Sequence, residues 1–122
     1  MPPRYANGKI CYIEIPATDV SRSADFYRKV FGWEIHQRGD GATAFHDNVE
    51  VSGAWITGRP PATDPGFMIY IMVKSVAETC SAIEANGCEI LAQHTHGHDV
   101  VAQFRDPAGN VVGLYEERSL SA

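Results

Sequence analysis

The sequence predicts an α+β fold of two tandem βαβββ modules, because the chain repeats itself. Each half contains, in the same order, a strand-like run, a helix-like run, a Gly-x-Glu-Ile tetrapeptide and a final strand-like segment that follows an aspartate turn. The matching segments are residues 32–35 and 87–90, residues 44–47 and 103–106, and residues 51–55 and 111–115. Two such modules are expected to form curled mixed sheets that enclose a cavity, where a ligand would bind.

The first module, at about residues 8–58, begins with a strand at residues 10–15, where alternation places Tyr12 and Glu14 on one face. Thr18 or Asp19 can cap the helix that follows, and Gly32 can end it. The apolar stripe of this helix consists of Val20, Ala24, Tyr27 and Phe31. Further strands are expected at residues 33–38, 42–47 and 50–58, the first two joined by a hairpin turn.

The second module, at about residues 67–117, repeats this order after a proline-rich linker at residues 59–66. Its first strand, at residues 67–73, places Met68, Tyr70 and Met72 on one face. Ser75 followed by Glu78 predicts a capping box at the start of the helix. Strands are then expected at residues 88–94, 99–105 and 110–117, and a turn at residues 106–110 joins the last two.

Composition narrows the class of protein. The chain has 122 residues, of which 44% are hydrophobic and 20% are charged, as is typical of a soluble globular domain. The net charge of −5 with no basic stripe argues against nucleic acid as a partner. No apolar run reaches the roughly 20 residues of a membrane span. The cysteines, Cys11, Cys80 and Cys88, lack metal-type spacing and are expected as reduced thiols in a cytoplasmic protein.

Three motifs give the chain a resemblance to a known superfamily. They are the segments at residues 14–19 (EIPATD), 26–34 (FYRKVFGWE) and 104–110 (FRDPAGN). They resemble the vicinal oxygen chelate superfamily of glyoxalases, bleomycin resistance proteins and extradiol dioxygenases. The resemblance covers nearly the whole chain and implies one glyoxalase-like domain over residues 1–122, with a homodimer as the expected assembly. It implies a fold more than a reaction, because this fold hosts many chemistries.

The resemblance also implies where a metal would be held. Metal enzymes of the superfamily carry a ligand, usually His or Gln, on the first strand of each module, seven residues before the helix cap. Another, usually Glu, lies on the last strand of a module. The corresponding positions here are Tyr12, Met68, Gly53 and Gly113. Glycine has no ligand atom and a thioether suits copper(I) rather than divalent ions, so no metal or other cofactor is expected. A metal-free branch of the superfamily carries similar motifs.

Two polar residues are candidates for chemistry on the cavity face. Glu14, next to Tyr12, could act as a general acid or base, or it could form an ion pair with a nearby arginine that fixes the strands. His46 precedes Asp47 and could face the cavity or its rim, although the sequence offers it no evident orienting partner. No catalytic residue is assigned on this basis.

Aromatic and thioether side chains are expected to line the cavity. The lining would suit a flat or apolar organic ligand, and ordinary core filling is the alternative. With the two polar candidates, Glu14 and His46, the predicted substrate-binding residues are Tyr12, Trp55, Met68, Tyr70 and Tyr115, and Met72 shares their face.

The histidines His94, His96 and His98 alternate in the segment HTHGH. On one strand they would share a face, and three imidazoles can bind zinc, nickel or copper. Gly97 interrupts the run close to a predicted hairpin turn, which favours a solvated loop with adventitious metal affinity.

The sequence therefore predicts a glyoxalase-like protein that binds a small apolar or aromatic molecule without the superfamily's metal. One alternative is a metal-dependent lyase, isomerase or dioxygenase with unusual ligands such as His46, Glu14 or the histidines at residues 94–98. Another is a drug-sequestering resistance protein that works as a dimer. Whether a reaction is catalysed stays open.

Overall fold

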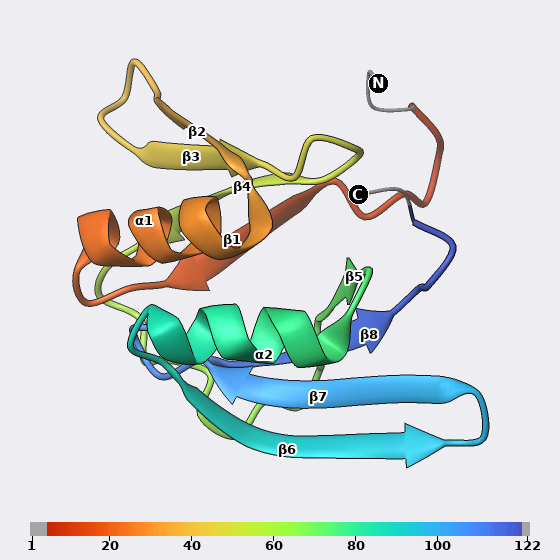
Figure 1. The fold of residues 1–122 in the computed structure, drawn as a ribbon. Helices are drawn as coiled ribbons and strands as arrows, with labels where there is room; N and C mark the ends of the chain where they lie inside the picture. Colours follow the sequence, from red (N-terminus) through yellow and green to blue (C-terminus); the bar gives the residue numbers. More distant parts are fainter. Residues whose placement is uncertain (1–4, 121–122) are drawn as a thin grey trace. The chain divides into compact units, whose positions relative to one another are not determined.

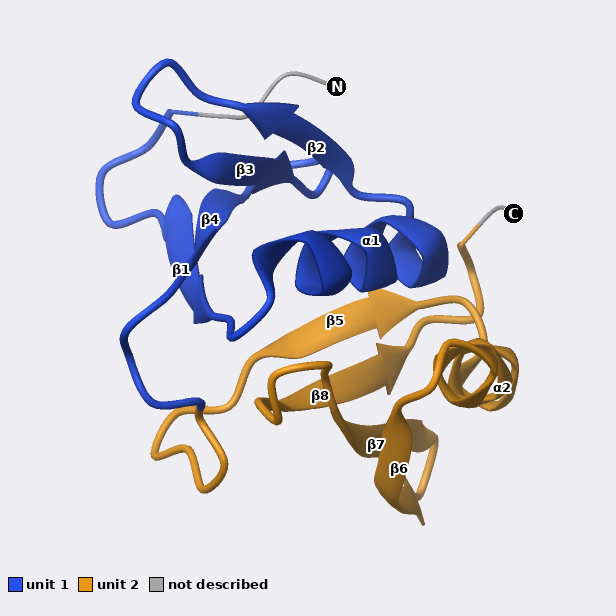
Figure 2. Ribbon diagram, turned by 90° about the vertical axis from the view of Figure 1, so that its left-hand side faces the viewer, with its two compact units in different colours: residues 1–61 blue, residues 62–122 orange. Residues whose placement is uncertain are grey.

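The computed structural model describes residues 5–120 of a chain that divides into two compact units, residues 1–61 and residues 62–122 (Figure 2). Each unit consists of one helix and a four-stranded mixed sheet, in the order strand, helix and three strands. The predicted α+β fold of two tandem βαβββ modules is therefore confirmed. Neither helix within the described range has the length and apolar character needed to cross a membrane.

Unit 1 contains β1 (Tyr12–Pro16), α1 (Val20–Phe31), β2 (Glu34–Gln37), β3 (Thr43–His46) and β4 (Ser52–Ile56) (Figure 1). Its sheet has the order β1-β4-β3-β2, in which β1 is parallel to β4 and the other pairs are antiparallel. Helix α1 begins where Asp19 accepts a hydrogen bond from the backbone N–H of Arg22 at 3.1 Å. It ends at Gly32, whose φ of 73° gives the left-handed conformation that glycine adopts at helix ends.

An aromatic cluster between α1 and the sheet forms the core of unit 1. Tyr27 of α1 and Phe45 of β3 are each 1% exposed, and Trp55 of β4 is 2% exposed. Trp33 stacks on Tyr27 and on Phe45, with ring centroids 4.7 and 4.6 Å apart. Burying a large apolar side chain stabilises a fold by about 1.5–3 kcal/mol. This cluster therefore determines which face of the sheet packs against α1.

Unit 2 contains β5 (Tyr70–Val73), α2 (Val76–Ala85), β6 (Glu89–His96), β7 (Asp99–Arg105) and β8 (Val111–Glu116). Its sheet has the order β5-β8-β7-β6 and the same parallel first pair as unit 1. Ser75 caps α2 by accepting a hydrogen bond from the backbone N–H of Glu78 at 3.1 Å. The core lies between α2 and the sheet, and its fully buried side chains are Val76, Ile83, Ala102, Phe104 and Leu114.

Two strands of unit 2 differ from the prediction. Strand β5 begins at Tyr70 and not at residue 67, because Tyr70 is its first residue that pairs with a residue of β8. One backbone hydrogen bond lies just before that pair, where the Gly113 N–H donates to the Ile69 carbonyl at 2.8 Å. Strand β6 continues to His96, beyond the predicted end at residue 94. Gly97 has a φ of 59°, which permits a two-residue turn and lets His96 pair with Asp99.

Candidate functional site

In each unit, the cross-strand register decides which side chains face away from the helix. We call this side of each sheet its distal face. In unit 1 it carries Tyr12 and Glu14 of β1, which pair with Ser52 and Ala54 of β4. In unit 2 it carries Tyr70 and Met72 of β5, which pair with Gly113 and Tyr115 of β8. Residues that pair directly across strands lie on the same face of a sheet. Most of the predicted binding residues therefore lie on these two faces.

Tyr12 is held by an arginine that the sequence analysis did not single out. Arg38, just after β2, donates from Nη1 to the Tyr12 hydroxyl oxygen at 2.5 Å, and its Cζ lies 5.9 Å from the centre of the Tyr12 ring. Arg38 also forms an ion pair with Asp40 at 3.0 Å. Hydrogen bonds to Asp40 and then to Tyr12 raise the pKa of the Arg38 guanidinium. The Tyr12 side chain is thus oriented, with 42% of the residue exposed.

Glu14 forms an ion pair with Arg59, with 2.7 Å between Oε1 and Nη2. Of the two roles that the sequence allowed for Glu14, the structure shows the ion pair. Both side chains are substantially exposed, at 40% for Glu14 and 59% for Arg59. Exposed pairs of this kind stabilise a fold by only about 0–1 kcal/mol, so the pair chiefly neutralises the carboxylate on the distal face.

His46, at the end of β3, has the orienting partner that its sequence context did not reveal. Its Nδ1 accepts a hydrogen bond from the backbone N–H of Asn48 at 2.9 Å. Asn48 adopts a positive φ of 71° and donates from Nδ2 to the Gly32 carbonyl at 2.8 Å. In a neutral imidazole that accepts at Nδ1, the proton lies on Nε2. Through its pairing with Ser52, His46 lies on the same distal face as Tyr12.

Trp55 does not lie on the face that was predicted for it. It pairs with Ile15 of β1 and contacts Tyr27 of α1, with 5.9 Å between ring centroids. The prediction that Trp55 shares a face with Tyr12 is therefore wrong, because Tyr12 lies three positions from Ile15 along β1 and side chains alternate between faces. Met68 precedes β5 and is half-buried.

Tyr70 lies flat against the distal face of unit 2. A Cβ atom at Gly113, its cross-strand partner, would be 2.5 Å from Cδ2 and 2.6 Å from Cε2 of the Tyr70 ring. The ring therefore occupies the space that a side chain at position 113 would fill, and 48% of Tyr70 stays exposed. Packing of an aromatic ring over a cross-strand glycine is a known means of fixing a register.

Tyr115 and Met72 extend this surface. The Tyr115 hydroxyl donates a hydrogen bond to Oδ1 of Asp99 at 3.1 Å. The Asp99 carboxylate raises the pKa of the Tyr115 hydroxyl, because it accepts from the protonated phenol and repels the phenolate. Met72, paired directly with Tyr115, is 56% exposed. Asp99 was not among the predicted site residues, and its position opposite the end of β6 could be found only from the hairpin register.

The two repeats align differently from the prediction at their last strands. The predicted alignment made Gly53 equivalent to Gly113. In the structure Gly113 pairs with Tyr70, whereas the residue that pairs with Glu14 is Ala54. Ala54 and Gly113 each lie seven residues after the aspartate of the preceding turn. The predicted equivalence is therefore wrong by one residue, and such a slip moves a side chain to the other face of the sheet.

The positions that the resemblance implies for a metal do not carry suitable ligands in this corrected register. They are Tyr12, Ala54, Met68 and Gly113. Alanine and glycine provide no ligand atom, and a thioether is too soft for divalent ions of this chemistry. Within residues 5–120, no three His, Cys, Asp or Glu side chains form a group that could hold a metal ion. The residues present therefore do not fit the superfamily's divalent metal.

Comparisons with a family model and with a related protein indicate the same family. The model of the family described as Glyoxalase/Bleomycin resistance protein/Dioxygenase superfamily matches residues 9–114. A "Glyoxylase-like domain-containing protein" from Didymella fabae is 33% identical over 90 residues, which are 66% of this chain and 70% of that protein.

Solved structures show the same fold at lower sequence identity. TnmS3, an antibiotic binding protein from Streptomyces sp. CB03234, has a TM-score of 0.70 and 20% identity, with 93% of this chain and 98% of that chain covered. A fosfomycin resistance protein, FosX, from Listeria monocytogenes, solved with Mn(II) and 1S,2S-dihydroxypropylphosphonic acid, has a TM-score of 0.74 and 17% identity, with 91% and 90% covered. At these identities the likeness concerns the fold alone.

Proposed function

Because the chain belongs to the Glyoxalase/Bleomycin resistance protein/Dioxygenase superfamily, we propose that it binds a small apolar or aromatic molecule on the distal faces of its sheets. We propose further that it does so without the divalent metal of the superfamily's enzymes. The absence of a divalent metal is supported by the residues at the four ligand positions, which together cannot chelate such an ion. These residues are Tyr12, Ala54, Met68 and Gly113.

The observation that carries the proposal is the position of Tyr70. Its ring rests on the backbone at Gly113, and almost half of the residue is exposed. The ring is therefore fixed on one side and accessible on the other. A fixed aromatic surface binds a planar ligand by offset stacking, with little loss of side-chain entropy, and such ring pairs contribute about 0.5–1.5 kcal/mol beyond the buried area.

The neighbours of Tyr70 favour a ligand with both apolar and hydrogen-bonding parts. Met72 offers an exposed thioether that adapts to apolar and aromatic shapes. The Tyr115 hydroxyl and Asp99 carboxylate add polar atoms on the same face. In unit 1, Tyr12 and its arginine partner Arg38 offer an aromatic ring beside a cation. A few placed polar groups among apolar ones are typical of ligand sites.

The antibiotic binding activity named for TnmS3 is compatible with such a role, and aromatic antibiotics are a reasonable first set of test ligands. The test is a thermal-shift screen of aromatic compounds with the untagged protein, followed by calorimetric titration of each hit. A ligand at 100 times its Kd should stabilise the protein by about 2.7 kcal/mol.

Three variants test the role of Tyr70 in that binding. Tyr70→Ala should weaken binding about fivefold to tenfold through the loss of stacking. Gly113→Ala should also weaken it, because the added methyl group displaces the ring. Phe67→Ala is the matched control, since Phe67 is 96% exposed, precedes the strand and should leave binding unchanged. Equal affinities for wild type and Tyr70→Ala would contradict the proposal.

Metal analysis tests the second part of the proposal. Exposed histidines take up metals from buffers, so the analysis uses a His94→Ala/His96→Ala variant purified without a His-tag. We expect substoichiometric zinc, nickel, iron and manganese. A stoichiometric ion in that variant would favour a metal-dependent enzyme instead.

We also propose a homodimer in the reducing cytoplasm. Cys11, Cys80 and Cys88 are in the reduced state, which is usual for cysteines in that compartment. Light scattering on a size-exclusion column at several concentrations tests the assembly, and a monomer at every concentration would rule out the dimer.

A further inference from the structure

The β6–β7 hairpin presents two imidazoles on one face. His94 pairs with Val101, and His96 pairs with Asp99. Val101 in turn pairs with Tyr115, so both histidines lie on the distal face of unit 2. Both are exposed. The continuation of β6 to His96 therefore produces a His-x-His arrangement on a regular strand and not in a solvated loop.

The two rings are close enough to share a metal ion after a small side-chain movement. Their centroids are 6.3 Å apart and their planes differ by 38°. An imidazole nitrogen binds zinc at about 2.0–2.1 Å, so two rings on one ion have centroids roughly 5–6 Å apart. Exposed side chains change their χ angles at little cost, and a modest rotation brings the rings into that range.

The surroundings favour a cation. Asp99 lies directly opposite His96 and carries an exposed carboxylate on the same face. Its negative charge lowers the energy of a positive ion beside the imidazoles. Strand β6 lies at the edge of its sheet, next to β7 alone, so no further strand of that sheet crowds the histidines.

We propose that His94 and His96 form a chelating site for a divalent transition-metal ion, namely Cu²⁺, Ni²⁺ or Zn²⁺. Imidazole is a preferred ligand of these ions. Two protein ligands leave the remaining coordination positions to water, which agrees with the absence of any group of three metal-binding side chains within residues 5–120. The site uses none of the positions that the superfamily's metal enzymes use, and it is independent of the stacking role of Tyr70.

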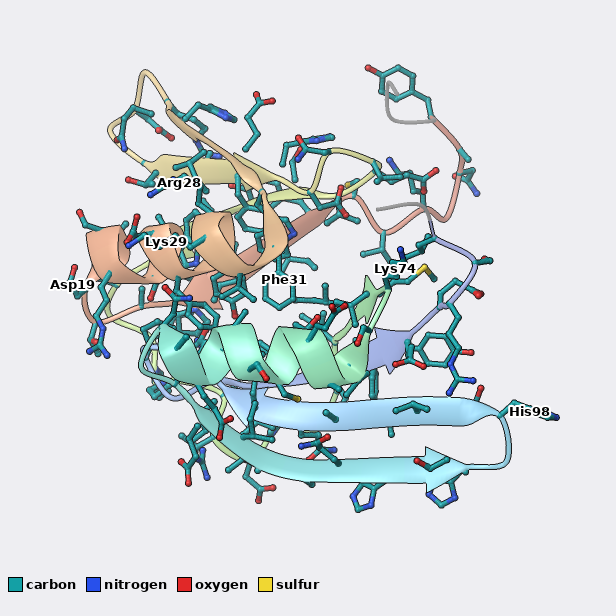
Figure 3. All side chains as sticks on the ribbon, viewed as in Figure 1. Asp19, Arg28, Lys29, Phe31, Lys74 and His98 are labelled. Atoms are coloured by element: carbon teal, nitrogen blue, oxygen red, sulfur yellow. The ribbon has the colours of Figure 1, made fainter. Side chains whose placement is uncertain are left out.

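His98 provides a matched control within the same hairpin. It lies in the turn after Gly97, and Figure 3 shows it at the tip of the β6–β7 hairpin, directed away from the sheet. It is exposed like the other two histidines and lies two residues from His96, but it belongs to the turn and not to strand β6. A chelating site requires the pair on β6 and not His98.

The experiment titrates the untagged full chain with Cu²⁺, and separately with Ni²⁺ and Zn²⁺, by isothermal calorimetry. We expect one ion per chain for wild type and for His98→Ala. His94→Ala and His96→Ala should each weaken binding at least about tenfold, because each leaves a single imidazole. Electron paramagnetic resonance of the Cu²⁺ complex should show nitrogen ligands that diminish in both variants.

Two results would overturn the proposal. One is unchanged affinity in both His94→Ala and His96→Ala. The other is an equal loss in His98→Ala, which would indicate independent, adventitious binding by single exposed histidines. Circular dichroism and melting temperatures of the same variants verify that each is folded, so a loss of binding cannot come from unfolding.

Discussion

Two glycines, one on the last strand of each unit, have different structural roles. Gly113 faces away from α2 and leaves space for the ring of Tyr70. Gly53 faces α1, where an added Cβ would lie 2.0 Å from the Ile13 carbonyl oxygen and 2.4 Å from Cζ of Phe45. One glycine therefore shapes a candidate binding surface, and the other permits core packing.

We expect Gly53→Ala to lower the free energy of unfolding by about 3 kcal/mol, at the upper end of the usual cost of overpacking. The backbone carbonyl of Ile13 cannot move without breaking strand pairing, and Phe45 is fully buried. Urea denaturation measures the change. Gly66→Ala is the control, because position 66 has open space around it and should change stability by less than about 1 kcal/mol. Similar stability of the two variants would contradict this account of Gly53.

At the scale of elements, an aspartate turn precedes the last strand of each unit. Asp47 accepts backbone hydrogen bonds from Val49, Glu50 and Val51 at 2.9–3.0 Å. Asp106 is 4% exposed and accepts from the backbone of Ala108 and Asn110 and from the Asn110 side chain. Asn110 in turn accepts from the backbone N–H of Ala62 at 2.7 Å. The second turn thus also anchors the start of unit 2.

Replacement of the two aspartates should therefore have unequal effects. Asp106→Ala leaves buried donors without an acceptor and should cost about 3 kcal/mol of stability. Asp47→Ala breaks bonds whose donors are closer to solvent and should cost about 1 kcal/mol. Thermal and urea unfolding of both variants measure the difference. A larger loss in Asp47→Ala would show that the first turn, and not the second, is the critical one.

Each of the two units of the molecule has its own core, and the exposure of the cysteines differs between the units. Cys11 precedes β1 in unit 1 and is exposed, whereas Cys80 lies on α2 in unit 2 and is buried. Burial raises the pKa of the Cys80 thiol, which lowers its thiolate fraction and its reactivity at neutral pH. Thiol modification therefore reports the opening of unit 2 separately.

In native buffer, Cys11 should react with a thiol reagent first, and Cys80 at least about a hundredfold more slowly, because α2 must open before reaction. Peptide mapping by mass spectrometry over a time course identifies the modified residue. In Cys11→Ser the fastest phase should disappear. Equal rates for Cys11 and Cys80 would show that α2 does not protect its cysteine.

Local patterns in the sequence predicted the two helices, the cap at Ser75, a cap at Thr18 or Asp19, of which the structure shows Asp19, and the order of elements along the chain. These features depend on neighbouring residues, so periodicity and capping chemistry suffice. The distal-face position of Tyr12, Glu14 and Tyr70 also followed from alternation along their strands. The prediction for Trp55 was wrong because the alignment of the two repeats was shifted by one residue. Similar residues on two strands do not reveal which face of the sheet each residue occupies.

The superfamily, the tandem βαβββ architecture and the poor fit of the residues to the superfamily's metal could be inferred before the fold was known, because each depends on residue identity at motif positions. The folded structure alone specifies the contacts between distant segments. It paired Glu14 with Arg59, placed the Tyr70 ring on Gly113, turned Trp55 towards α1 and brought His94, His96 and Asp99 onto one face. Such contacts depend on strand register, and a one-residue change in register exchanges the two faces of a sheet.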